Sequence, residues 1–256
     1  MPQLNRFCTI ANDERKLKTL DRVPVRVTPT LSGSSLLELT QNNNILVIPA
    51  GTAYNLTPNV TFTANVMVWG AGGGSTPSLG GAGGFSTGII QFEANVAYNV
   101  AAGNTGVGGG GGSGIEFLVN ANPIIIAGGG GGGGSAVGGA GGGLFAANGT
   151  GLGATAYGKA SPGIYRTGGP GTGAAFGMGL GGTGTGAGGG GMYGGALNAA
   201  GGGGGSGYLN NDVVVVGSGN TITGSGVNAA NPSAPIRGNF GNTANNGLIV
   251  ITLLNT

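Results

Sequence analysis

The sequence has no histidine and a single cysteine, Cys8, among its 256 residues. Without histidine there is no imidazole general base, no Ser-His-Asp or Cys-His unit and no histidine metal ligand. One cysteine cannot form a disulfide within the chain or a thiolate zinc cluster. We therefore expect no metal site, no cofactor and no histidine-dependent catalysis.

Charged residues are scarce: 9 Lys and Arg with 7 Asp and Glu make up 6% of the chain, against about 25% in an average domain. Nucleic-acid binding needs many basic contacts to phosphates, so we expect no nucleic-acid partner. The acidic residues after the N-terminal region are Glu38, Glu93, Glu116 and Asp212. Paired carboxylates can hydrolyse glycosides, but Glu93 and Glu116 lie in or beside strand patterns, which favours solvent-facing positions. We expect no enzymatic activity.

Long apolar stretches are also missing. No run approaches the 18 residues of a membrane-spanning helix, and the N-terminus lacks the apolar core of a secretory signal. Glycine motifs of nucleotide sites occur at the rate expected by chance, and the nearest P-loop match, 158–160, reads Gly-Lys-Ala without the required hydroxyl. The sequence therefore predicts a protein that is made in a cytoplasm and has neither a membrane-spanning helix nor a nucleotide-binding site.

Glycine is what the chain has in excess: 65 residues, about a quarter, against an ordinary usage of about 7%. The run of seven at 128–134 excludes the every-third-residue pattern of collagen. Disorder is the main alternative, but a hydrophobic content of 39% and a mean hydropathy of +0.22 differ from a highly charged, solvated chain. Since glycine buries no side chain, lateral backbone hydrogen bonds between extended three-fold helices are the remaining way to order such segments.

Charge and glycine divide the chain into two parts. Nine of the sixteen charged residues lie in the first 26, whereas Gly33 and Gly51 are the two glycines that precede Gly70. We predict an N-terminal virion-attachment segment at 1–40 and a glycine-rich domain at 41–256. The stretch 12–22, rich in Glu, Arg, Lys and Leu, is the one helix candidate.

Alternation of apolar and polar residues predicts strands over 60–68 and 89–100. Shorter apolar runs predict the others, at 36–40, 45–48, 115–119, 124–126, 213–216 and 248–254. Glycine blocks lie between or after these runs, at 70–74, 80–84, 106–114, 128–134, 138–143, 186–191 and 201–207. The fold class we predict is mainly β and irregular: strands flanking a bundle of polyglycine II helices joined by loops, with a small charged N-terminal head.

The segments between the glycine blocks carry most of the tyrosines. Tyrosine, arginine and methionine are enriched at recognition surfaces, although the same side chains can simply cap a glycine bundle. The candidate receptor-binding residues, from the loops 144–167, 192–200 and 208–212, are Tyr157, Lys159, Tyr165, Arg166, Met192, Tyr193 and Tyr208.

The order of these motifs resembles a known family. An apolar strand ends in Val-Met-Val-Trp-Gly-Ala-Gly-Gly-Gly at 66–74, Gly-Gly-Ala-Gly-Gly-Phe follows at 80–85, and Ala-Ala-Gly-Asn-Thr-Gly stands at 101–106. Ile-Ile-Ile-Ala-Gly-Gly-Gly occupies 124–130, and Asn-Gly-Leu-Ile-Val-Ile closes the pattern at 246–251. Over roughly 45–254 the chain resembles the glycine-rich domain of tailed-bacteriophage fibre proteins, and is similar in kind to the tip adhesins of T-even-type long tail fibres.

The resemblance implies a virion tail-fibre component, assembled in the host cytoplasm, whose bundle loops bind a protein or glycan receptor on the host surface. We expect the charged head to dock onto other tail or fibre proteins through Arg15, Lys16, Lys18, Arg22 and Arg26. Alternatives are a structural spacer or capsid decoration without a receptor, a depolymerase, and an ice-binding protein. Fibres are often trimeric, yet such a bundle can form within one chain, so the sequence leaves a homotrimer open.

Overall fold

The computed structural model describes residues 25–29, 37–39, 44–50, 53–106, 108–150, 185–231 and 233–254. Strands are the regular elements of these ranges, which contain no helix, so the protein is mainly β as expected. The strands are β1 (Val25–Pro29), β2 (Leu37–Leu39), β3 (Ile45–Pro49), β4 (Ala53–Pro58), β5 (Phe62–Trp69), β6 (Phe85–Phe92), β7 (Tyr98–Ala101), β8 (Ser113–Phe117), β9 (Pro123–Ala127), β10 (Tyr208–Leu209), β11 (Asn220–Ile222) and β12 (Leu248–Leu253).

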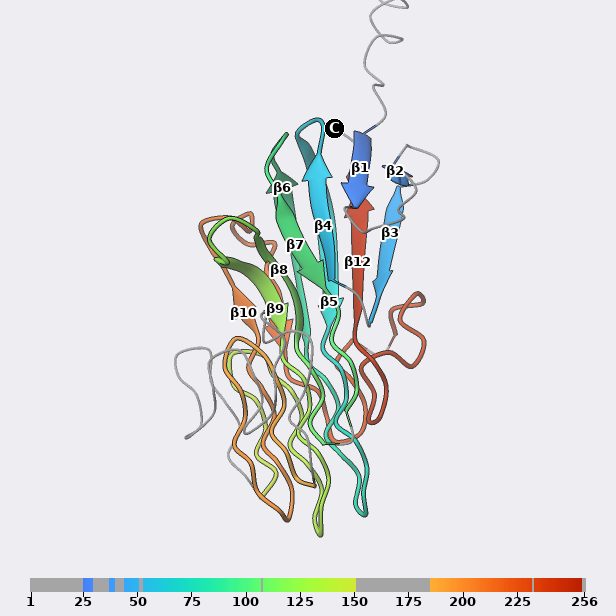
Figure 1. Cartoon of the computed structure of the whole chain (residues 1–256), viewed down its shortest axis with the longest axis vertical. Coiled ribbons are helices and arrows are strands. Elements are labelled where there is room, and N and C mark those ends of the chain that lie inside the picture. Colours follow the sequence, from blue (N-terminus) through green and yellow to red (C-terminus); the bar gives the residue numbers. More distant parts are fainter. Residues whose placement is uncertain are drawn as a thin grey trace, which may run out of the picture.

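The strands form two antiparallel sheets. One has seven strands in the order β10-β9-β8-β7-β4-β1-β2, and the other has five in the order β11-β6-β5-β12-β3. Their inner faces share one apolar core, which makes this part of the molecule a sandwich (upper half of Figure 1). In β5 the buried residues alternate with half-buried ones, as the sequence pattern predicts for a strand with one face in a core.

Aromatic rings fill the end of the core that lies away from the glycine segments. Phe62 stacks on Phe92 with 4.9 Å between ring centroids, and Tyr98 meets Phe92 edge-on at 5.0 Å. All three side chains are buried. The hydroxyl oxygen of Tyr98 accepts a hydrogen bond from the Glu93 N–H at 2.8 Å, so its one polar atom is satisfied.

Two of the strand predictions are wrong. The pattern over 89–100 predicted one strand, but β6 ends at Phe92, and a turn with Asn95 at a φ of 60° leads into β7. The valine run 213–216 is a turn with a single bridge from Val214 to Ile90 of β6, because the N–H groups of Val213 and Val214 both donate to the carbonyl of Asn210. Apolar content alone could not distinguish this turn, in which Val216 is 93% exposed, from a strand.

The region predicted as an N-terminal head contributes two strands. β1 pairs with β4 and β2 pairs with β1, so both belong to the seven-stranded sheet. Arg26 lies on β1 opposite Glu38 on β2 in the strand register. The predicted helix at 12–22 and the other four docking residues lie outside the described residues.

The glycine segments continue directly from the ends of the strands. Residues 70–74 run on from β5 and 80–84 return into β6, while 128–134 leave β9 and 201–207 lead into β10 (Figure 1). At one such junction the hydroxyl of the buried Ser113 donates to the Trp69 carbonyl at 2.7 Å and accepts from the Gly103 N–H at 2.9 Å. We call the segments 70–74, 80–84, 108–112, 128–134, 138–143, 186–191 and 201–207 the glycine bundle.

Candidate functional site

The central segment of the glycine bundle, 128–134, donates its N–H groups in a repeat of three. Gly128 and Gly131 donate to the segment 138–143, Gly129 and Gly132 to 186–191, and Gly130 and Gly133 to 70–74. These N···O distances run from 2.7 to 3.2 Å. Three successive residues therefore bond to three different neighbours, unlike a β-strand, in which they alternate between two sides.

The carbonyl groups of the same segment accept hydrogen bonds from three further neighbours. Gly81 and Gly84 donate to it from 80–84, Gly110 from 108–112, and Gly202 and Gly205 from 201–207. The central segment is thus surrounded by six others, three as acceptors and three as donors. Every backbone N–H and C=O group between Gly128 and Gly133 has a hydrogen-bond partner. The segment can therefore be buried without the cost of an unpaired backbone polar group.

Close approach of the backbones explains the need for glycine in this segment. A Cβ added to Gly131 would overlap the carbonyl oxygen of Gly202, and one added to Gly129 would overlap that of Gly110. Five of the six outer segments contain one small, buried side chain each, namely Ala71, Ala82, Ala140, Ala187 and Ser206, and the sixth, 108–112, is glycine throughout. The longest uninterrupted glycine run therefore marks the centre of the bundle.

Three short loops join glycine segments at the end remote from the sandwich (Figure 1). We call these loops, 75–79, 135–137 and 197–200, the tip. Backbone hydrogen bonds hold them to the bundle and to each other, from Ser78 N–H to the Gly134 carbonyl at 3.0 Å and from Ala136 N–H to the Ala200 carbonyl at 2.5 Å. They are positioned by the bundle rather than by a core of their own.

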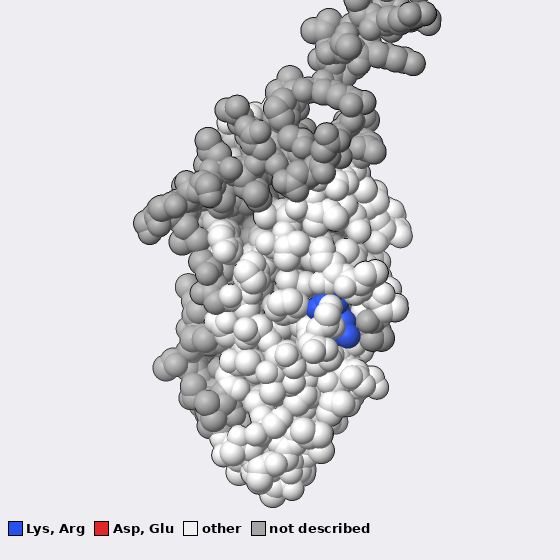
Figure 2. Space-filling model, turned by 90° about the vertical axis from the view of Figure 1, so that its right-hand side faces the viewer, with Lys and Arg blue, Asp and Glu red and all other residues white. Residues whose placement is uncertain are grey.

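The tip is uncharged and partly apolar. Its loops read Ser-Thr-Pro-Ser-Leu, Ser-Ala-Val and Leu-Asn-Ala-Ala. Leu79 and Val137 are each 50% exposed and Leu197 is 43% exposed. Figure 2 shows a face of the molecule on which uncharged residues predominate around one small basic patch. Such a surface suits contacts through apolar groups and hydrogen bonds rather than ion pairs.

No group of three acidic, cysteine or histidine residues that could hold a metal occurs within the described ranges.

Arg237 is 5% exposed, and burial lowers its pKa. Its guanidinium donates to the Phe240 carbonyl at 2.7 Å and to Asn242 Oδ1 at 2.8 Å. It thereby shapes the segment that follows, in which Thr243 Oγ1 donates to the Gly80 carbonyl at 2.7 Å. This arginine organises a loop against the bundle.

The predicted receptor residues that the structure describes lie together, but away from the tip. Met192 and the half-buried Tyr193 and Tyr208 pack with Ala101 and Ile126 where the bundle meets the seven-stranded sheet. Tyr208 begins β10 and pairs with Ile126, so it is not in a loop. Tyr157, Lys159, Tyr165 and Arg166 lie outside the described residues, as do Arg15, Lys16, Lys18 and Arg22.

Sequence reasoning placed recognition in the tyrosine-rich loops and did not single out two of the three tip loops. The signal was present in the lengths of the interruptions. Each of the loops 75–79 and 135–137 separates two glycine blocks by a few residues and contains one large apolar side chain. A short turn between two extended segments must lie at their common end, whereas a tyrosine can lie at either end.

Searches with the sequence against protein-family models and curated proteins found no match. Among the described residues, none forms a helix with the length and apolar character needed to cross a membrane.

Proposed function

We propose that the glycine bundle consists of polyglycine II helices, packed so that each inner helix has six neighbours. The three-residue repeat of donors in 128–134 supports this, because that helix has three residues per turn and no hydrogen bonds of its own. All N–H and C=O groups then point sideways toward neighbouring segments. At about 3.1 Å per residue, the seven glycines span about 22 Å.

We further propose that the protein is a tail-fibre component of a bacteriophage, with the tip as its adhesive surface for a host receptor. The observation that carries this proposal is the polarity of the molecule. β1 and the C-terminal end of the described chain lie at the sandwich end, and the tip lies at the opposite end of the long axis (Figure 1). A chain attached through its N-terminal region would present the tip outward, on a rigid support.

The tip itself favours recognition over a spacer role. Leu79, Val137 and Leu197 are exposed on three loops that come from distant parts of the sequence, and a spacer has no need to gather apolar side chains at its free end. Exposed apolar groups that lie together commonly mark interaction sites. The contact with the receptor would be insensitive to salt, since the loops contain no charge.

A triple substitution tests the adhesive role: Leu79→Ser, Val137→Ser and Leu197→Ser. All three side chains are exposed, so folding should be retained while binding of the purified protein to susceptible cells falls by at least about tenfold, the effect of losing ~1.4 kcal/mol. The matched control is Val119→Ser with Val216→Ser, two valines 91% and 93% exposed outside the tip. Equal binding by both variants and the parent would support a spacer.

Docking of the N-terminal segment is a separate part of the proposal. Deleting residues 1–24 removes Arg15, Lys16, Lys18 and Arg22 but keeps β1 and its pairing with β4. We expect the truncated protein to fold and to be missing from particles imaged by electron microscopy. Full occupancy on the particles would refute the docking role without affecting the tip.

A further inference from the structure

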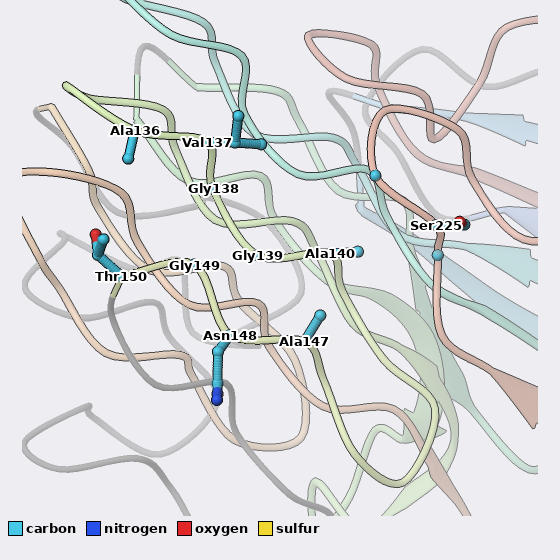
Figure 3. A pocket seen from close by; sticks show the side chains of 12 residues that line it. Ala136, Val137, Gly138, Gly139, Ala140, Ala147, Asn148, Gly149, Thr150 and Ser225 are labelled. Atoms are coloured by element: carbon cyan, nitrogen blue, oxygen red, sulfur yellow. The ribbon is translucent and has the colours of Figure 1, made fainter.

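A groove of about 540 Å³ runs along one side of the glycine bundle. Three stretches of chain line it: 136–140, 147–150 and 224–226. Figure 3 shows Ala140 and Ala147 on neighbouring stretches, with the stretch that contains Ser225 across from Ala140. None of the lining residues is charged, and most are glycine or alanine.

The hydrogen bonds of the segment 138–143 explain why the groove is there. Gly138 and Gly141 donate to the carbonyls of Leu79 and Ala82, and Gly139 and Gly142 donate to those of Gly202 and Gly205. In the three-residue repeat, the third donor position is Ala140. No described residue accepts a hydrogen bond from its N–H.

The carbonyl groups of this segment identify the neighbours on either side of that missing position. Ala140 O accepts from Ala147 N–H and Gly141 O accepts from Gly224 N–H, each at 2.9 Å. The carbonyls of 138–143 point in three directions. Residues 147 and 224 donate hydrogen bonds to them from two of these directions, and the central segment donates to Gly139 O from the third. Of the six places around 138–143, described residues fill five, and the sixth lies between 147–150 and 224–226, where the groove is.

We propose that this groove binds an extended glycine-rich peptide from another polypeptide, which completes the bundle as one more helix. The proposal rests on the polyglycine II packing proposed above. The Ala140 N–H would donate to a carbonyl of the peptide. The backbones of the bundle approach so closely that an added Cβ overlaps a neighbouring carbonyl, so the peptide must be glycine at the positions that face the groove walls. An uncharged groove also disfavours a charged segment.

The length of the groove sets the size of the peptide. Val137 and Ala140, both in its lining, are one three-residue turn apart, which is about 9 Å along such a helix. A peptide of seven residues covers this distance with a turn to spare. A suitable probe has the sequence Gly-Gly-Gly-Gly-Gly-Ser-Gly of this chain's own residues 201–207, followed by two lysines for solubility.

A pair of proline variants tests the packing on which the proposal depends. Proline suits the backbone of a polyproline-type helix but has no N–H. Ala140→Pro should leave the melting temperature unchanged, since that N–H has no described acceptor. Ala82→Pro removes the hydrogen bond from Ala82 N–H to the Gly226 carbonyl, and should lower the melting temperature by about 3 °C or more. Equal losses in both variants would refute the proposed packing.

Titration with the peptide tests the groove itself, by NMR of the amide of Ala140 in the full chain. We expect a saturable shift of this amide, weakened at least tenfold by Ser225→Trp and unaffected by Ser233→Trp. Ser225 and Ser233 are both exposed, but Ser225 alone of the two lines the groove. A peptide with every second glycine replaced by alanine should not bind.

Three results would overturn the proposal even if the proline variants behave as expected. One is a shift that Ser225→Trp leaves intact. Another is equal binding of the alanine-containing peptide. The third is strong protection of the Ala140 amide from hydrogen exchange before any peptide is added, which would mean that the position is already filled.

Discussion

In the sandwich, backbone hydrogen bonds run to two sides of each strand, and every second side chain is left to fill the core. In the glycine bundle they run to three donor and three acceptor neighbours, and the backbones themselves fill the space. The core of the sandwich contains large buried side chains such as Ile90, Phe92 and Tyr98. The largest side chain buried in the outer bundle segments 70–74, 80–84 and 138–143 is a methyl group.

The two regions should therefore fail in opposite ways. Removing atoms from the sandwich leaves a cavity, whereas adding atoms to the bundle forces backbones apart. Strands that continue into glycine segments pass from the sandwich to the glycine bundle within a few residues. One example is the end of β5, where Val68 and Trp69 precede Gly70. This arrangement lets a conventional core hold the ends of segments that have no core of their own.

The largest effect should come from emptying the sandwich. Phe92 is fully buried between Phe62 and Tyr98, so Phe92→Ala should lower the free energy of unfolding by about 3–5 kcal/mol. Urea denaturation followed by circular dichroism measures this. The control is Val216→Ala, which removes atoms from a side chain that is 93% exposed and should change stability by less than about 0.5 kcal/mol. Similar values for both would contradict the placement of the core.

The next effect should come from filling the bundle. Gly131→Ala places a methyl group against the backbone of Gly202, and neither segment can move without disturbing its other neighbours. We expect a loss of about 3 kcal/mol, at the upper end of the range for overpacked interiors.

The matched control for the bundle is Gly219→Ala. Its added methyl group would meet the side-chain ends of Leu209 and Val214, each at 3.1 Å, rather than backbone. Those ends can shift by a few tenths of an ångström, so the control should cost far less than Gly131→Ala. If the two substitutions cost the same, the bundle is looser than its hydrogen bonds indicate.

The same contrast explains what could be predicted from the sequence. Period-two alternation found β5, and short apolar runs found β3, β8, β9 and β12, because side chains record which face of a strand is buried. The strand β4 was missed because it is six residues long and ends in Pro58, so Tyr54 and Leu56 are its only large apolar residues before the proline. Glycine has no side chain whose polarity would show which side of a segment faces a given neighbour. The sequence therefore predicted where the bundle segments lie in the chain, but not which of them are neighbours in space.

The position of the tip was partly predictable for a similar reason. A short loop that joins two antiparallel segments must lie at one end of the bundle. The sequence alone was therefore enough to predict that the loops gather at the two ends. Which end faces outward depends on where the sandwich lies, and this in turn depends on strand pairing between distant residues such as Val250 and Met67. Short-range patterns do not contain that information.

The smallest effect we predict concerns the hydroxyl of Tyr98 at the aromatic end of the sandwich core. Burial, opposed in part by the hydrogen bond from Glu93 N–H, raises the pKa of Tyr98 above its ordinary value of 10.0. Below that pH both the folded and unfolded states keep the phenol proton, so this group does not make stability depend on pH. As the pH rises above about 10, the unfolded chain releases the proton first, and stability falls.

The variant Tyr98→Phe should show both sides of this balance. At neutral pH it loses the hydrogen bond between Glu93 N–H and the phenol oxygen, at a cost of about 1 kcal/mol. Above pH 10 its stability should decline less steeply than that of the parent, because one buried phenol no longer titrates. Urea denaturation at pH 7 and at several values above pH 10 gives both slopes. Parallel pH profiles would show that the ring is hydrated in the folded protein, and the sandwich would then be less dry at this end than its packing indicates.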